Sequence, residues 1–300
     1  MTNVSQALRT ANRAPLIVGR LAPTPSGYLH LGNAVNFVLT WLLVRRAGGV
    51  LHLRIDDLDR ARLRRSYLEN IFRVIDWLKI DYDHGPTGPD DFLARHSQLL
   101  HLPAYNNVLR RLAQQPGLLL GSQRTRTGGG DAAPVPLITP GAAWWAQVPP
   151  GTQMAIPDDW PEVGTAPLAA ELLSFMVRKK DGVAAYQLAS VVDDLRLGTT
   201  LIVRGRDLLP STAAQLWLAA QLVETRLFNV PRIQFFHHPL LTDAAGQKLS
   251  KSTQAQGEAG VLAHPAGPRA VYQAVAQLLG LPAEAGESLS TLQASLAIKR

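Results

Sequence analysis

Two distant segments of the sequence carry residue types that suit the binding of a nucleotide. The first is Pro25–Asn33, in which His30, Gly32 and Asn33 lie close together. The second is Lys248–Ser252, which carries two lysines and two serines. Backbone N–H groups at a helix start and lysine ammonium groups both favour phosphate. The two segments therefore predict a nucleotide site assembled from distant parts of the chain.

Alternating strand and helix patterns must position these residues. An apolar strand near 16–22, an amphipathic helix near 32–46 and a strand near 50–56 form a β-α-β unit, which implies a parallel sheet. His30 then lies at a strand-to-helix junction. Later patterns predict helices over 66–78 and 96–112, a strand over 173–177, a helix over 184–193, a strand over 201–203, a helix over 211–223 and two short helices after Ala263.

Composition narrows the class of protein. The 300 residues include 30 Lys and Arg against 23 Asp and Glu, and the net charge of +7 favours a polyanionic partner such as nucleic acid. The sequence has no cysteine, which excludes disulfides and thiolate metal sites. No apolar run suits a signal peptide or a bilayer crossing, so we expect a cytoplasmic protein without a membrane partner.

Seven blocks of residues, in order along the chain, point to a family. Arg20–Gly27 reads RLAPTPSG, and His30–Asn33 reads HLGN. Downstream, in the same order and approximate spacing as in the family, lie Arg54–Arg62, Arg178–Gly182, Tyr186–Asp194, Val203–Leu208 and Lys248–Lys251. Together they resemble the catalytic domain of the class I glutamyl-tRNA synthetases. The resemblance covers about residues 15–255 and is weakest in the middle.

The resemblance implies an α/β fold with a Rossmann-like parallel sheet, an inserted domain and a short helical C-terminal tail. The segment after about Gly121 is rich in Gly, Pro, Ala and Thr, and we expect irregular structure there. The expected division is residues 15–120 for the first half of the catalytic domain, 121–170 for the insertion, 171–262 for the second half with the lysine-serine loop, and 263–300 for the tail.

The resemblance also implies that the nucleotide is ATP, accompanied by Mg²⁺. His30 and Lys251 are then the catalytic residues, and His30, Gly32, Asn33, Lys248 and Lys251 bind ATP. No Gly-x4-Gly-Lys-Ser/Thr motif occurs, which argues against a P-loop enzyme. Many compact relatives bind zinc through cysteines in the insertion. Because this chain has no cysteine and its eight histidines lack ligand spacing, we expect no zinc and no other protein-held metal.

Glutamate is the implied amino acid, and arginine binds its carboxylates with a planar pair of donors. An acidic group should meet the ammonium of the amino acid, and Asp56 stands where the family usually has glutamate. Aspartate is one methylene shorter than glutamate, so a different amino acid is the alternative. The positions that match the family's glutamate site are Arg20, Ala22, Thr24, Asp56, Tyr186 and Arg204.

Length favours one branch of the family. Only 48 residues follow Ser252, from 300 minus 252, whereas full-length members carry a long helical anticodon-binding region there. The compact branch places glutamate on the queuosine base of tRNA(Asp), and we expect that tRNA as the partner of a monomer. The alternatives are another acceptor, or a nonenzymatic module that binds tRNA or a nucleotide.

Some side chains have a structural interpretation beside the functional one. Asp57 and Asp59 fit a solvated turn paired with arginines, and Tyr186 falls on the apolar side of its predicted helix, where core packing competes with substrate binding. For Asp193 and Asp194 we expect a structural role. A structural and an RNA-binding interpretation also stand side by side for two sets of residues. The tryptophans could be buried in the insertion or stack on bases: Trp144, Trp145 and Trp160. The basic cluster could be a solvated helix face or contact RNA phosphate: Arg60, Arg62, Arg64 and Arg65.

Overall fold

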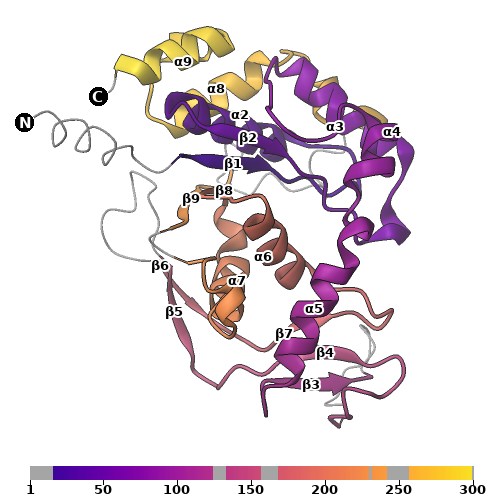
Figure 1. Cartoon of the computed structure of the whole chain (residues 1–300). Coiled ribbons are helices and arrows are strands. Elements are labelled where there is room, and N and C mark those ends of the chain that lie inside the picture. Colours follow the sequence, from indigo (N-terminus) through magenta and orange to yellow (C-terminus); the bar gives the residue numbers. More distant parts are fainter. Residues whose placement is uncertain (1–15, 124–132, 157–167, 230–231, 242–256, 299–300) are drawn as a thin grey trace, which may run out of the picture.

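A four-stranded parallel sheet lies at the centre of the protein (Figure 1). The computed structural model describes residues 16–123, 133–156, 168–229, 232–241 and 257–298. The strands run in the order β2-β1-β8-β9, and the register places Val18 beside Val50, Gly19 beside Leu201 and Leu201 beside Gln234. Their bounds are Val18–Leu21 for β1, Val50–Leu53 for β2, Leu201–Gly205 for β8 and Gln234–His238 for β9. The predicted parallel α/β architecture is confirmed.

Strand β8 shows why this sheet is covered on both faces. Leu201 and Val203 are buried in the core beneath α2 (Leu31–Arg46), while Ile202 points to the opposite core. That opposite core includes side chains of α6 (Tyr186–Arg196) and α7 (Leu209–Ala219). An unbroken apolar run is typical of a strand buried on both sides.

Helix α2 is apolar around most of its circumference because it is covered on two sides. It packs on the sheet, where Gly19 allows close approach: a Cβ there would lie 2.4 Å from Val44 Cγ2. On the other side lies the C-terminal α8 (Arg269–Leu278), which α9 (Leu289–Ile298) accompanies (Figure 1). The two predicted tail helices are therefore present and complete the larger core.

The inserted part contains two small antiparallel sheets, so the expectation of irregular structure throughout this part is wrong. One has the order β3-β4-β7, and the other pairs β5 with β6. The strands are Leu119–Ser122, Ala143–Ala146, Gln153–Ile156, Leu168–Glu171 and Phe175–Arg178, from β3 to β7.

Strand β7 corrects a second expectation. A strand was predicted over 173–177 as the point where the parallel alternation resumes, but β7 pairs with β4 in the inserted sheet. Parallel strands resume only at β8. The boundary between insertion and second half at residue 170 remains our proposal, as do the other segment limits.

The remaining elements connect these layers. The helix predicted over 66–78 is α3 (Arg65–Trp77), and the one predicted over 96–112 is only α5 (Leu102–Ala113). Within the described ranges, no helix combines the length and apolarity that a bilayer crossing requires. The short elements are α4 (Pro89–Asp91), a π turn at Phe92–His96, and 3-10 turns at Arg60–Arg62, Gln98–His101, Arg206–Leu208, Val223–Thr225, Gly257–Ala263 and Ala283–Glu287.

Candidate active site

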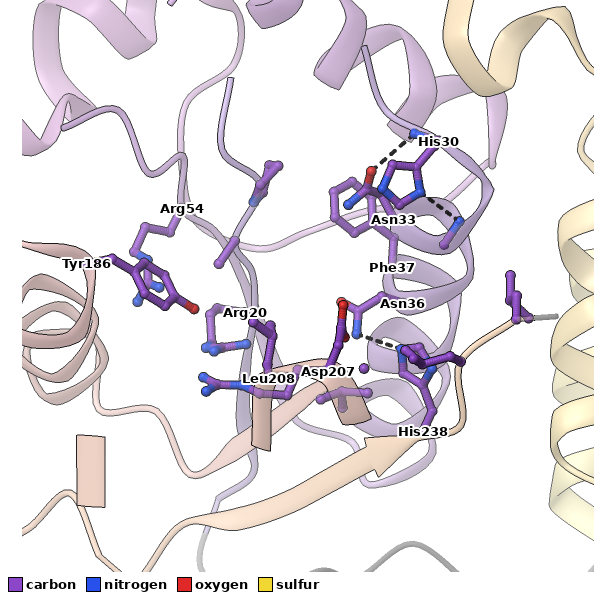
Figure 2. A pocket seen from close by; sticks show the side chains of 18 residues that line it. Arg20, His30, Asn33, Asn36, Phe37, Arg54, Tyr186, Asp207, Leu208 and His238 are labelled. Carbon is purple, nitrogen blue, oxygen red and sulfur yellow. Dashed lines mark hydrogen bonds between the residues drawn. The ribbon is translucent and has the colours of Figure 1, made fainter. Parts of the chain in front are cut away.

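A cavity of about 250 Å³ opens at the carboxyl ends of β1, β8 and β9. The sheet order changes direction between β1 and β8, and ligands of open α/β sheets bind outside the carboxyl ends at such a point. Figure 2 shows Arg20, Arg54 and Tyr186 toward one end of this cavity and His30 with Asn33 toward the other. The fold has therefore brought residues from both halves of the chain to one cavity.

His30 begins helix α2 and caps it with its own side chain. Its Nδ1 accepts from the Gly32 N–H at 3.1 Å, and its backbone N–H donates to Asn33 Oδ1 at 3.1 Å (Figure 2). A Cβ on Gly32 would lie 3.1 Å from His30 Cε1, so glycine is what lets the ring lie there. Because Nδ1 is the acceptor, the neutral ring carries its proton on Nε2. The Gly32 N–H predicted to meet phosphate is thus already hydrogen-bonded to imidazole.

Arg20, at the end of β1, is held by a buried carboxylate. Its Nε donates to Asp194 Oδ1 at 2.9 Å, and the same oxygen accepts from Arg54 Nη1 at 2.7 Å. Burial alone would raise the pKa of Asp194, but the charges of Arg20 and Arg54 outweigh it and lower that pKa. Arg54 also binds Asp56 through Nε at 2.7 Å. Asp194, which was expected to be structural, thus positions a predicted glutamate ligand.

Arg204, at the end of β8, has a different environment. Its Nη1 donates to Thr212 Oγ1 at 3.2 Å and to Gln215 Oε1 at 3.0 Å, both on α7. Among the residues that the structure describes, its buried Nη2 has no hydrogen-bond partner. Burial lowers the pKa of the Arg204 guanidinium, and the positive charge of Arg20 acts in the same direction. This end of the cavity therefore favours an anion.

A second pocket, of about 960 Å³, lies beside the first and shares Tyr186 with it. Tyr186 is 42% exposed, so the core-packing interpretation is wrong for it. Thr24 and Asp56 line this second pocket, whereas Arg20, Ala22 and Arg204 line the first. The six residues predicted to bind glutamate are thus divided between two neighbouring pockets.

Asp56 is ion-paired rather than open to a ligand ammonium. Its Oδ1 accepts from Arg54, and Gln98 Nε2 lies 3.4 Å from the same oxygen. Burial raises the pKa of the Asp56 carboxyl even though Arg54 opposes that shift. Its predicted contact with an amino group remains a prediction.

Burial and hydrogen bonds distinguish the roles of the neighbouring aspartates. Asp57 is 1% exposed and accepts from the Ser97 hydroxyl at 2.6 Å and the Gln98 N–H at 2.8 Å, so it is not solvated as expected. The expected pairing with an arginine is present, since Arg60 Nη1 donates to Asp57 Oδ2 at 2.7 Å. Asp59 is about half exposed and lines the second pocket. Asp193 accepts from Tyr105 and Gln98, which supports its expected structural role.

Comparison with known proteins decides the family. The model described as "tRNA synthetases class I (E and Q), catalytic domain" matches residues 16–112 and 165–298. The chain belongs to the class I tRNA synthetases. The match extends across both halves of the parallel sheet and leaves a gap in the inserted part, where we expected the resemblance to be weakest.

Similar synthetases include two named glutamyl-Q tRNA(Asp) synthetase. The one from Symbiobacterium thermophilum is 36% identical over 294 residues, which are 89% of this chain and 87% of that protein. The one from Nitratidesulfovibrio vulgaris is 34% identical over 261 residues, 80% of this chain and 79% of the relative.

Solved structures agree on the fold. A glutamate-tRNA synthetase from Elizabethkingia anophelis superposes with a TM-score of 0.63 at 20% identity, and a glutamate tRNA ligase from Elizabethkingia meningosepticum with 0.62 at 20%. Each comparison covers 80% of this chain but only 54% and 53% of the solved chains, so this chain spans about half their length.

The tryptophans of this synthetase separate into two roles. The Trp144 indole N–H donates to Leu137 O at 2.9 Å, and Arg178 lies 4.7 Å above its ring, so Trp144 is structural. Trp145 lines the second pocket with Met176, its partner across β4 and β7. Trp160 lies outside the described residues.

The lysine-serine segment of the synthetase, with Lys248 and Lys251, also lies outside the described residues. The chain before it, at Leu240 and Leu241, lines the first cavity. After it, the Val261 N–H donates to Leu29 O at 2.7 Å, beside the His30 loop.

Several residues that line the first cavity were not predicted. Asn36 lies one turn after Asn33, and its Nδ2 is 3.4 Å from His238 Nε2 at the end of β9 (Figure 2). An amide within an otherwise apolar helix and a histidine at a strand's carboxyl end were the available signals. Phe37, Asp207 and Leu208 complete this wall.

Proposed function

We propose that this synthetase activates glutamate with ATP and transfers the glutamyl group to the queuosine base of tRNA(Asp). The observation that carries the proposal is the cavity that places two buried arginines, Arg20 and Arg204, near the His30 helix start. A dicarboxylate and a triphosphate are the anions that such a cavity would hold together. The names of the most similar relatives support the same reaction.

In the first step, a carboxylate oxygen of glutamate attacks the α-phosphorus of ATP. The bond from that phosphorus to the bridging oxygen of pyrophosphate breaks, and pyrophosphate leaves with the electron pair. In the second step, a nucleophilic group of the queuosine base attacks the carbonyl carbon and loses its proton to solvent. The bond from that carbon to the phosphate oxygen breaks, and AMP leaves with the electron pair. Both steps depend chiefly on positioning and on offsetting charge.

The two catalytic residues would act at the nucleotide end. The Nε2–H of His30 suits donation to a phosphate oxygen, and rotation of the ring would also release the Gly32 N–H. Lys251, with Lys248, would supply cations to the leaving pyrophosphate. The positions of Leu241 and Val261, which flank the lysine-serine segment, support this assignment.

Mg²⁺ belongs to the proposal as a companion of ATP. Among the described residues no group of three or more His, Asp or Glu side chains could hold a metal ion. The ion would therefore arrive on the phosphates, where it offsets their negative charge. The predicted lack of zinc stays a prediction.

The second pocket is the proposed place for the acceptor base. Trp145 offers a flat ring, and Thr24, Asp56 and Asp59 add a hydroxyl and two carboxylates to the lining. Lys179 and Leu58 line the pocket as well, and the Lys179 Nζ donates to Leu58 O at 2.8 Å. Since Tyr186 borders both pockets, a base here would lie next to the activated amino acid.

The decisive experiment is amino-acid-dependent exchange of pyrophosphate into ATP, measured with a panel of amino acids. Exchange with glutamate supports the proposed activation step. Exchange with a different amino acid only would overturn the glutamate assignment, and its absence under every condition would favour a binding module. The acceptor is tested separately by comparing queuosine-containing tRNA(Asp) with the unmodified tRNA.

Trp145→Ala tests the acceptor pocket. We expect glutamyl transfer to fall on the order of tenfold more than pyrophosphate exchange does, because base stacking on an aromatic ring stabilises a complex by about 1–3 kcal/mol. Trp144→Phe is the matched control, since it changes a ring outside the pocket. Equal losses in transfer and exchange for Trp145→Ala would place the base elsewhere.

A further inference from the structure

Arg204 is the buried arginine of the first cavity that lacks a carboxylate partner among the described residues. It is 4% exposed. Its Nη1 donates to the neutral oxygens of Thr212 and Gln215, both of which are fully buried, and its Nη2 has no hydrogen-bond partner in the described ranges. A buried guanidinium without a counter-ion costs several kcal/mol of stability.

The ion pairs around it leave one arginine over. Arg20, Arg54 and Arg204 contribute three positive charges, and the carboxylates ion-paired to them among the described residues, Asp56 and Asp194, contribute two negative ones. The nearby Asp193 carboxylate is paired with Arg196 at 3.6 Å. Three minus two leaves one positive charge. Because Arg20 and Arg54 share Asp194, the uncompensated charge falls on Arg204.

Gln215 is the residue that keeps this charge uncompensated. Its Oε1 accepts from Arg204, but its buried Nε2 has no hydrogen-bond partner within the described part of the chain. A glutamate at this position would forfeit no hydrogen bond among the described residues and would give Arg204 an ion pair. Neither packing nor hydrogen bonding therefore explains the amide, whereas the need for a free positive charge does.

We propose that Thr212 and Gln215 determine amino-acid specificity by holding Arg204 through neutral acceptors, so that its charge is available to the side-chain carboxylate of the substrate. This inference rests on the proposed function. The reacting carboxylate loses its charge when it becomes an acyl phosphate, whereas the side-chain carboxylate stays ionised through both steps. Only the side-chain carboxylate can therefore pair with Arg204 throughout the reaction. Glutamine has no side-chain carboxylate.

The test compares Gln215→Glu with Gln215→Met in pyrophosphate exchange, using glutamate and glutamine as substrates. In Gln215→Glu the new carboxylate competes with the substrate, and we expect KM for glutamate to rise roughly 30-fold or more while kcat changes much less. The preference of Gln215→Glu for glutamate over glutamine is expected to fall as this KM rises. Gln215→Met removes the acceptor without adding charge, so it raises KM but keeps the preference.

Thermal unfolding of the ligand-free proteins supplies a second readout. Gln215→Glu is expected to unfold at a higher temperature than the wild type, since it pairs a buried charge, and to gain less stability from added glutamate. An unchanged glutamate preference in Gln215→Glu, or an equal loss of preference in Gln215→Met, would overturn the inference. Failure of the wild type to exchange with glutamate would instead overturn the proposed function.

Discussion

Two of the arginines that line the first cavity, Arg20 and Arg204, are both buried but differ in what holds them. Arg20 donates to the carboxylate of Asp194, which also binds Arg54. Arg204 donates to the hydroxyl of Thr212 and the amide oxygen of Gln215. Within the described part of the chain, the Arg20 guanidinium is ion-paired with a carboxylate and the Arg204 guanidinium is not.

This difference teaches that burial of a cation does not by itself define its role. A compensated arginine is a fixed set of hydrogen-bond donors, and its partner sets its orientation. An uncompensated one is an anion site, since a ligand carboxylate relieves its cost of burial. Removal of the ion pair of Arg20 should therefore mainly lower the stability of the fold. Removal of Arg204 should mainly lower the affinity for the ligand.

The largest effect is expected from Asp194→Asn. The change removes the shared counter-ion of Arg20 and Arg54 while keeping the shape of the side chain, so two buried cations are left with Asp56 alone. We expect the free energy of unfolding at neutral pH to fall by about 3 kcal/mol. Denaturation in urea measures it, and a loss below about 1 kcal/mol would contradict the assignment of Asp194 as the counter-ion.

The stabilisation that the Asp194 carboxylate contributes should depend on pH. The pKa of Asp194 is lowered from its ordinary 3.8, because Arg20 and Arg54 outweigh the effect of burial. As pH falls through 3.8 the unfolded chain takes up the proton first, so the stabilisation is complete above 3.8 and is lost as pH falls toward the folded-state pKa. The difference in unfolding free energy between wild type and Asp194→Asn should shrink over that window. A constant difference would exclude the linkage.

Arg204→Met should lower the activity with glutamate rather than the stability of the fold. Removal of the uncompensated cation is expected to lower kcat/KM for glutamate by roughly 100-fold, the effect of losing a charge-assisted pair to a carboxylate. The free energy of unfolding should stay level or rise, because no carboxylate is left unpaired. Arg20→Met is the matched control and should lose stability, because the fully buried Asp194 then keeps one of its two arginine partners. Similar stability losses in both variants would erase the distinction between the two arginines.

The sequence predicted those elements whose structure depends on neighbouring residues in the chain. The β-α-β start, the helix start at His30 and the apolar strand of β8 follow from periodicity and residue type. Strand β7 did not, because four residues do not reveal whether their partner is β8 or β4. Its pairing is fixed by β4, far away in the sequence.

The polar network of the site was hidden for the same reason. Asp57 is buried by Ser97 and Gln98, 40 and 41 residues away, and Asp194 by Arg20, 174 residues away. A local reading of adjacent aspartates favours a turn or a helix cap. Resemblance supplied Arg20 and Arg204 as ligands, but only the structure shows which of them is neutralised.

The smallest effect is expected from Tyr186→Phe, which tests whether the two arginines share their ligand with a neutral group. Tyr186 borders both pockets and is 42% exposed, so the change removes one hydroxyl and leaves the core intact. A neutral hydrogen bond contributes about 0.5–1.5 kcal/mol, which corresponds to a rise in KM for glutamate of roughly 2- to 12-fold. The unfolding midpoint should not change. If KM moved as far as in Arg204→Met, the amino acid would depend on the hydroxyl as much as on the uncompensated charge, and the contrast between the arginines would lose its functional meaning.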